Sequence, residues 1–135
     1  MHEQSLLRYH PLVGSQGEWH TCAKRDVVRT DYGAAVLDDH LYIVGGNSCS
    51  GSLDIVQRYS FASDRWEFAT SMSTGLKSCT AGTAGDALVV VGEGRLEMFD
   101  VDEDRWSLDT DVPMTIYDEE YDYTYDFRSC FVVLW

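Results

Sequence analysis

A chain of 135 residues with 10 Lys plus Arg against 23 Asp plus Glu has a formal net charge of −13, which argues against nucleic acid or an anionic membrane as a partner. The length suits one ordinary domain. No stretch approaches the roughly 20 apolar residues of a membrane-spanning helix, and the N-terminus lacks the basic start and apolar core of a signal peptide.

Short segments with strand character follow one another in a pattern that occurs twice. In the first copy they lie at 33–37, 41–44 and 53–59, and a fourth begins at Trp66. In the second copy the pattern ends at Trp106, 40 positions after Trp66. Glycines and Asp-Asp pairs separate the segments, and no window shows a helical apolar period. The sequence therefore predicts an all-β fold of repeated units, each with four antiparallel strands.

The repeated unit resembles the kelch repeat, in which a glycine pair follows an apolar strand and precedes Tyr or Phe and then Trp. The first copy matches fully, through Gly45, Gly46, Tyr59 and Trp66. The second copy matches through Phe99 and Trp106, but its Gly92 is followed by Glu93. A weaker match upstream comprises Tyr9 and Trp19, with an insertion at 13–17 that we expect in a hairpin loop. The resemblance implies an incomplete kelch-type β-propeller in which these aromatic residues pack in the core.

The repeats divide the chain into four expected segments. Residues 1–27 would be the last two strands of a partial blade, 28–74 and 75–114 two full kelch repeats, and 115–135 an acidic Tyr-rich loop followed by the first strand of a further blade. Closed propellers need roughly four to eight blades. We therefore expect a fragment of a longer protein or, as the alternative, a piece that completes a ring by self-association.

Cysteine and histidine usage gives no sign of metal or catalytic chemistry. The cysteines (Cys22, Cys49, Cys79 and Cys130) show no metal-ligand spacing, and unpaired thiols suit a reducing cytoplasm. Cys49 lies in a Gly/Ser loop, where an exposed reactive thiol is an alternative to a plain loop residue. The four histidines form no ligand pair, and there is no phosphate loop or nucleophile turn. We expect neither an enzyme nor a cofactor.

The candidate partner-binding surface follows from the topology. In an up-and-down sheet the loops after the second and fourth strands share one end, and loops on a rigid scaffold commonly carry recognition. The candidate residues on these loops are Lys24, Arg25, Arg29, Asn47, Ser48, Ser50, Lys77, Tyr117 and Tyr121. The last two belong to segment 109–127, where tyrosine and acidic residues alternate. This segment could be a connector, a recognition loop or a tyrosine-phosphorylation target.

The resemblance implies a protein–protein interaction module. The spacing of Arg58-Tyr59 and Trp66 resembles the kelch-like subgroup, whose members serve as substrate-recognition parts of cullin-RING ubiquitin ligase adaptors. In that subgroup a BTB region, which these residues do not contain, binds cullin-3. The alternatives are a cytoskeletal, actin-binding scaffold and a non-functional truncated isoform.

Overall fold

The computed structural model describes residues 5–25, 27–109, 115–118 and 123–126. All regular elements in these ranges are β-strands, which confirms the expected all-β class. None of the described residues forms a helix long and apolar enough to cross a membrane.

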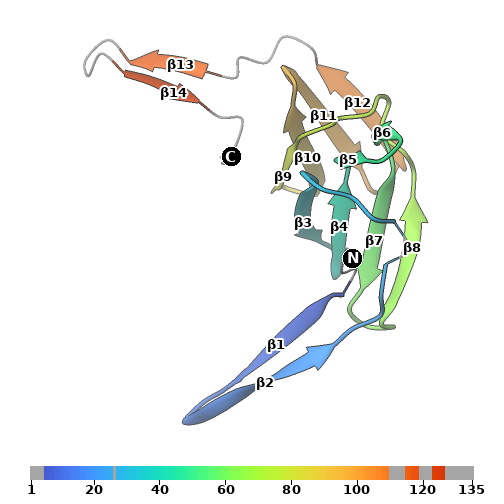
Figure 1. The fold of residues 1–135 in the computed structure, drawn as a ribbon, viewed down its shortest axis with the longest axis vertical. Coiled ribbons are helices and arrows are strands. Elements are labelled where there is room, and N and C mark those ends of the chain that lie inside the picture. Colours follow the sequence, from blue (N-terminus) through green and yellow to red (C-terminus); the bar gives the residue numbers. More distant parts are fainter. Residues whose placement is uncertain (1–4, 26, 110–114, 119–122, 127–135) are drawn as a thin grey trace.

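The chain begins with a hairpin of β1 (Leu7–Leu12) and β2 (Ser15–Thr21), which projects from one end of the molecule (Figure 1). Tyr9 lies opposite Trp19, and their ring centroids are 5.0 Å apart. The turn is shorter than expected, because residues 15–17 extend β2 instead of forming a loop.

The first four-stranded sheet has the order β3 (Gly33–Leu37), β4 (His40–Val44), β7 (Val56–Ser60) and β8 (Arg65–Ala69). A small hairpin of β5 (Asn47–Ser48) and β6 (Gly51–Ser52) interrupts the connection from β4 to β7. The third strand was expected from Leu53, but it begins at Val56 because Leu53 forms a separate bridge with Leu76.

The second four-stranded sheet repeats this arrangement with β9 (Thr80–Ala84), β10 (Ala87–Gly92), β11 (Arg95–Asp100) and β12 (Arg105–Asp109). Every neighbouring pair in both sheets is antiparallel, and strands adjacent in a sheet follow one another along the chain apart from the small hairpin. Each sheet is therefore a four-stranded meander.

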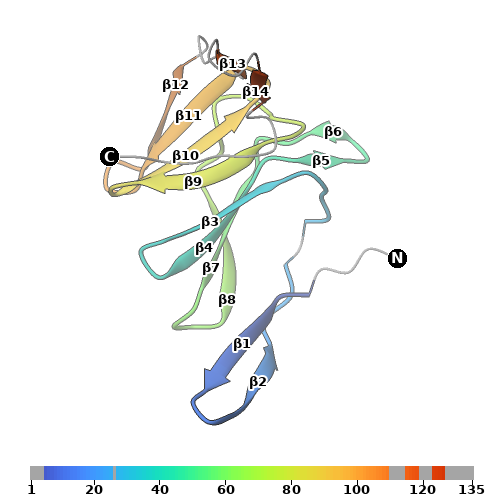
Figure 2. The same cartoon turned by 90° about the vertical axis from the view of Figure 1, so that its left-hand side faces the viewer.

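The hydrophobic core lies between the two sheets, which stand side by side in both views (Figures 1 and 2). Tyr42 and Val44 of the first sheet face Phe99 and Val90 of the second, and all four are at most 1% exposed. Strand alternation explains this arrangement, because residues two apart share one face.

A further hairpin, β13 (Thr115–Asp118) with β14 (Tyr123–Asp126), corrects the expectation of an acidic loop or connector after residue 114. The segment is rich in tyrosine and also contains Thr115, Ile116 and Thr124, residue types that favour strands despite the intervening carboxylates. Tyr121, Cys130 and the strand expected near the C-terminus lie outside the described residues.

Candidate functional site

The connections after β4 and after β8 lie together at one end of the sheets. Leu76 accepts a hydrogen bond from the Gly46 N–H at 2.8 Å and donates its own N–H to Leu53 at 3.1 Å. The two connections are thus fastened to each other by backbone bonds, and we call this region, together with segment 28–30 before β3, the loop end.

The loop end contains a hollow of about 390 Å³. Its wall comprises two short segments, Val28–Arg29–Thr30 and Asn47–Ser48–Cys49. Thr30 and Asn47 exchange two backbone hydrogen bonds, of 2.9 and 2.8 Å, which hold the segments edge to edge. The structure therefore brings Arg29, Asn47 and Ser48 together, as three of the candidate residues chosen from the loops.

Most side chains around this hollow are neutral hydrogen-bonding groups. The Ser48 and Ser50 hydroxyls lie 2.9 Å apart, and Ser48 Oγ also accepts the Ser50 N–H. Cys49 is an exposed free thiol, whereas the thiols of Cys22 and Cys79 are buried. Such a surface offers neutral hydrogen-bonding groups beside apolar area to another protein.

Arg29 differs from these neutral groups, because its side chain is charged and the residue is only 4% exposed. Its guanidinium donates to the carbonyl oxygens of Gly45 and Ile55 and to Gln57 Oε1, at 2.8–2.9 Å. Burial, and then the like charge of Arg25, lowers the pKa of Arg29 to about 10. The structure therefore assigns this side chain to holding the sheet together and not to contact with a partner.

The other candidate residues lie outside the hollow. Lys24 and Lys77 are exposed, and Arg25 is half-buried with its guanidinium 4.7 Å from the centre of the Tyr32 ring. Tyr117 lies on β13, and Tyr121 is outside the described residues. Sequence reasoning missed Val28 and Thr30, although the Thr30–Asn47 pairing has no local signal that could have indicated it.

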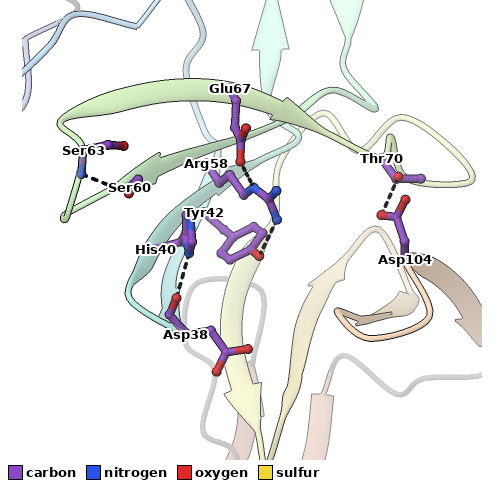
Figure 3. A network of polar contacts seen from close by, with 9 residues as sticks. All are labelled: Asp38, His40, Tyr42, Arg58, Ser60, Ser63, Glu67, Thr70 and Asp104. Atoms are coloured by element: carbon purple, nitrogen blue, oxygen red, sulfur yellow. Dashed lines mark hydrogen bonds and ion pairs between the residues drawn. The ribbon is translucent and has the colours of Figure 1, made fainter.

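A second hollow, of about 510 Å³, lies at the opposite end of the first sheet and is lined by His40, Ser60, Ser63, Arg65, Trp66 and Glu67. Beside this hollow, the strand register places Tyr42 of β4, Arg58 of β7 and Glu67 of β8 next to one another across the sheet (Figure 3). Arg58 donates to Tyr42 at 3.5 Å and forms an ion pair with Glu67, and the Tyr42 hydrogen bond in particular raises the pKa of Arg58. These polar groups therefore satisfy one another within the sheet.

Within the described ranges, no three His, Cys, Asp or Glu side chains are grouped so that they could hold a metal ion. The loop-end hollow remains the better candidate, because it gathers residues from two segments and lies on irregular connections.

Comparison with known proteins gives consistent matches. The kelch motif matches residues 29–73. Kelch-like protein 25 of Xenopus tropicalis is 26% identical over 113 residues, which cover 71% of this chain and 19% of that protein. The chain therefore spans about a fifth of the length of this curated relative.

Among solved structures, that of YjhT has a TM-score of 0.69 and 14% sequence identity. The match covers 82% of this chain and 45% of that chain, and at this identity it supports the fold alone. The kelch motif itself supports a protein-interaction module. Residues 29–73 are thus a kelch motif, and the chain that carries them is a partial kelch-type β-propeller.

Proposed function

We propose that this chain binds a partner protein through the loop end and forms the substrate-recognition part of a cullin-RING ubiquitin ligase adaptor. The main support for an interaction surface at the loop end is the hollow formed by Val28–Thr30 and Asn47–Cys49. Two backbone bonds between Thr30 and Asn47 fix its walls, so that little ordering is needed when a partner binds.

The adaptor role is supported by resemblance. The spacing of Arg58-Tyr59 and Trp66 is similar to that of kelch-like proteins, and a protein of that name is 26% identical to this chain. Binding to cullin-3 would require a BTB region outside these 135 residues. Substrate capture and ligase recruitment are therefore separable parts of the proposal.

Cys49 offers a direct test of the interaction surface, because it lies in the wall of the hollow and is exposed. In a Cys130→Ser background, a maleimide photocrosslinker attached to Cys49 should yield a covalent adduct with a partner protein in a cell extract, identified by mass spectrometry. The matched control carries the same reagent on Ser63→Cys, at the opposite end of the sheet, with Cys49→Ser and Cys130→Ser. An adduct that forms equally from both positions contradicts binding at the loop end.

The ligase role needs a different measurement. The complete protein that contains this chain should co-purify with cullin-3, and deletion of its BTB region should abolish that association without changing the Cys49 adduct. If the complete protein has no BTB region or does not bind cullin-3, the adaptor role is wrong while the interaction surface stands.

A further inference from the structure

The polypeptide leaving one sheet is fastened to the next by a tryptophan and an aspartate. Where the chain leaves β2, Trp66 Nε1 donates to the Ala23 carbonyl at 2.7 Å. Asp64 accepts the Ala23 N–H at 2.9 Å and the Tyr59 hydroxyl. This set of contacts joins the N-terminal segment to the first sheet, and we call it the first joint.

A matching set joins the first sheet to the second, and we call it the second joint. Thr70 follows Trp66 by four positions, as Ala23 follows Trp19, and its carbonyl accepts from Trp106 Nε1 at 2.8 Å. Asp104 takes the place of Asp64, 40 positions later. The bond from the indole N–H to the incoming chain and the position of the aspartate are therefore repeated along the chain.

The two joints differ in the source of one hydroxyl. Tyr59 in the first joint corresponds to Phe99 in the second, which has no hydroxyl. Its place is taken by Thr70, whose Oγ1 donates to Asp104 at 2.6 Å (Figure 3). Each aspartate thus receives one hydroxyl donor, from the buried ring in the first joint and from the incoming chain in the second.

Because Thr70 replaces the tyrosine as donor, the hydroxyl of the second joint is accessible to chemical modification. Tyr59 is 1% exposed and Ala23 has no reactive group, whereas Thr70 is exposed and begins an irregular connection after β8. Asp102, Glu103 and Asp104 are exposed in the facing turn. Arg105, which follows this turn, is paired with Glu103 at 2.7 Å.

We propose that Thr70 is a phosphorylation site and that its modification opens the second joint. The reaction is that of an ATP-dependent serine/threonine protein kinase. Thr70 Oγ1 attacks the γ-phosphorus, the bond from that phosphorus to the β,γ-bridging oxygen breaks, ADP leaves, and the hydroxyl proton passes to the kinase's base. Phosphothreonine no longer donates to Asp104 and places about two negative charges beside that carboxylate, which disrupts the contact.

Hydrogen exchange of the amides in 70–76 and 101–106 measures opening of the joint. Thr70→Ala should raise exchange there about fivefold, as expected for one hydrogen bond of about 1 kcal/mol. Phe99→Tyr should restore protection in the Thr70→Ala background, because the new hydroxyl replaces the lost donor. If Phe99→Tyr restores nothing, the exchange of donors is wrong.

Charge is tested separately. Thr70→Glu should raise exchange more than Thr70→Ala, and Asp104→Asn should remove the additional increase, whereas Ser71→Glu adds the same charge one residue away as the control. Phosphate on Thr70 should be detected by mass spectrometry after incubation with ATP and a cell extract. The proposal is overturned if the amides of the joint exchange no faster in Thr70→Glu than in Thr70→Ala or in Ser71→Glu. It is also overturned if neighbouring hydroxyls are phosphorylated and Thr70 is not.

Discussion

Gln57 and Glu97 occupy the same position in successive sheets, opposite Ile43 and Val90, and both are buried. Gln57 accepts from the Arg29 guanidinium at 2.8 Å. Glu97 instead accepts the backbone N–H of Ser73 at 2.9 Å and the Ser73 hydroxyl. This position therefore anchors the chain as it enters each sheet, by a different donor in each repeat.

The anchor at Arg29 gives a first prediction about stability. Arg29→Ala should lower the free energy of unfolding by about 3 kcal/mol, because it removes three hydrogen bonds and leaves the Gly45 carbonyl without this donor, whereas the Ile55 carbonyl keeps the Gly45 N–H at 3.3 Å. Urea unfolding measures the change. Lys24→Ala is the control, since this exposed side chain should contribute less than about 0.5 kcal/mol. Equal effects of the two substitutions would contradict the assignment.

Asp64 makes the first joint sensitive to acid. The Tyr59 hydroxyl, and then the Ala23 N–H, lowers the pKa of Asp64 below its ordinary value. Because the folded-state pKa is the lower one, the stabilisation is complete above the unfolded value of about 4 and is lost as the pH falls through the folded value.

Thermal melting should therefore show a loss of stability below about pH 4 that Tyr59→Phe makes shallower. Tyr9→Phe, which changes a tyrosine at the exposed hairpin, should keep the wild-type profile. Identical pH profiles for wild type and Tyr59→Phe would show that Asp64 does not depend on this hydroxyl.

At the scale of the elements, the glycines after the second strand explain where the repeats diverge. A Cβ on Gly46 would lie 2.5 Å from the Thr30 carbonyl oxygen, and a Cβ on Gly92 would lie 2.4 Å from that of Ser78. Glu93 follows Gly92 with a φ of 51°, a left-handed conformation that a non-glycine residue adopts at some cost. One glycine therefore lies against a backbone carbonyl in each repeat, the second of the pair at Gly46 and the first at Gly92.

Gly46→Ala should destabilise the protein by at least about 2 kcal/mol, because backbone strain at φ +96° adds to the steric conflict with Thr30. Gly85→Ala is the matched control. Its φ is +58° and nothing lies within 4 Å of the added Cβ, so only the conformational cost of about 1 kcal/mol is expected. Chemical denaturation measures the loss of unfolding free energy for each variant. Similar losses would contradict a close approach of Gly46 to the Thr30 carbonyl.

Strand positions could be predicted from local pattern, since apolar runs and turn residues carry that signal. Two features could not be. Arg29 resembles an exposed loop cation in the sequence, but its acceptors lie 16 to 28 positions away and become neighbours only on folding. The strands β13 and β14 were obscured by their carboxylates, although their remaining residues favour extended structure.

For the whole molecule, the packing of two sheets predicts a gradient of stability. β4 and β10 have strand neighbours on both edges and contribute much of the buried core, whereas β1 and β2 pair only with each other and are largely exposed. Backbone amides of β4 and β10 should exchange with solvent about 100-fold more slowly than those of β1 and β2, measured by mass spectrometry. Equal protection would mean that the hairpin unfolds with the sheets as one unit.

The same gradient has an optical consequence. The Trp19 side chain is 68% exposed, while the indole N–H groups of Trp66 and Trp106 are tied to backbone carbonyls in the joints. In a Trp135→Phe background, iodide should quench the fluorescence of Trp19 first and leave a shielded component from the other two. Trp19 is thus a built-in fluorescent reporter of the hairpin. Another molecule that covers the hairpin would reduce the quenching of Trp19 by iodide.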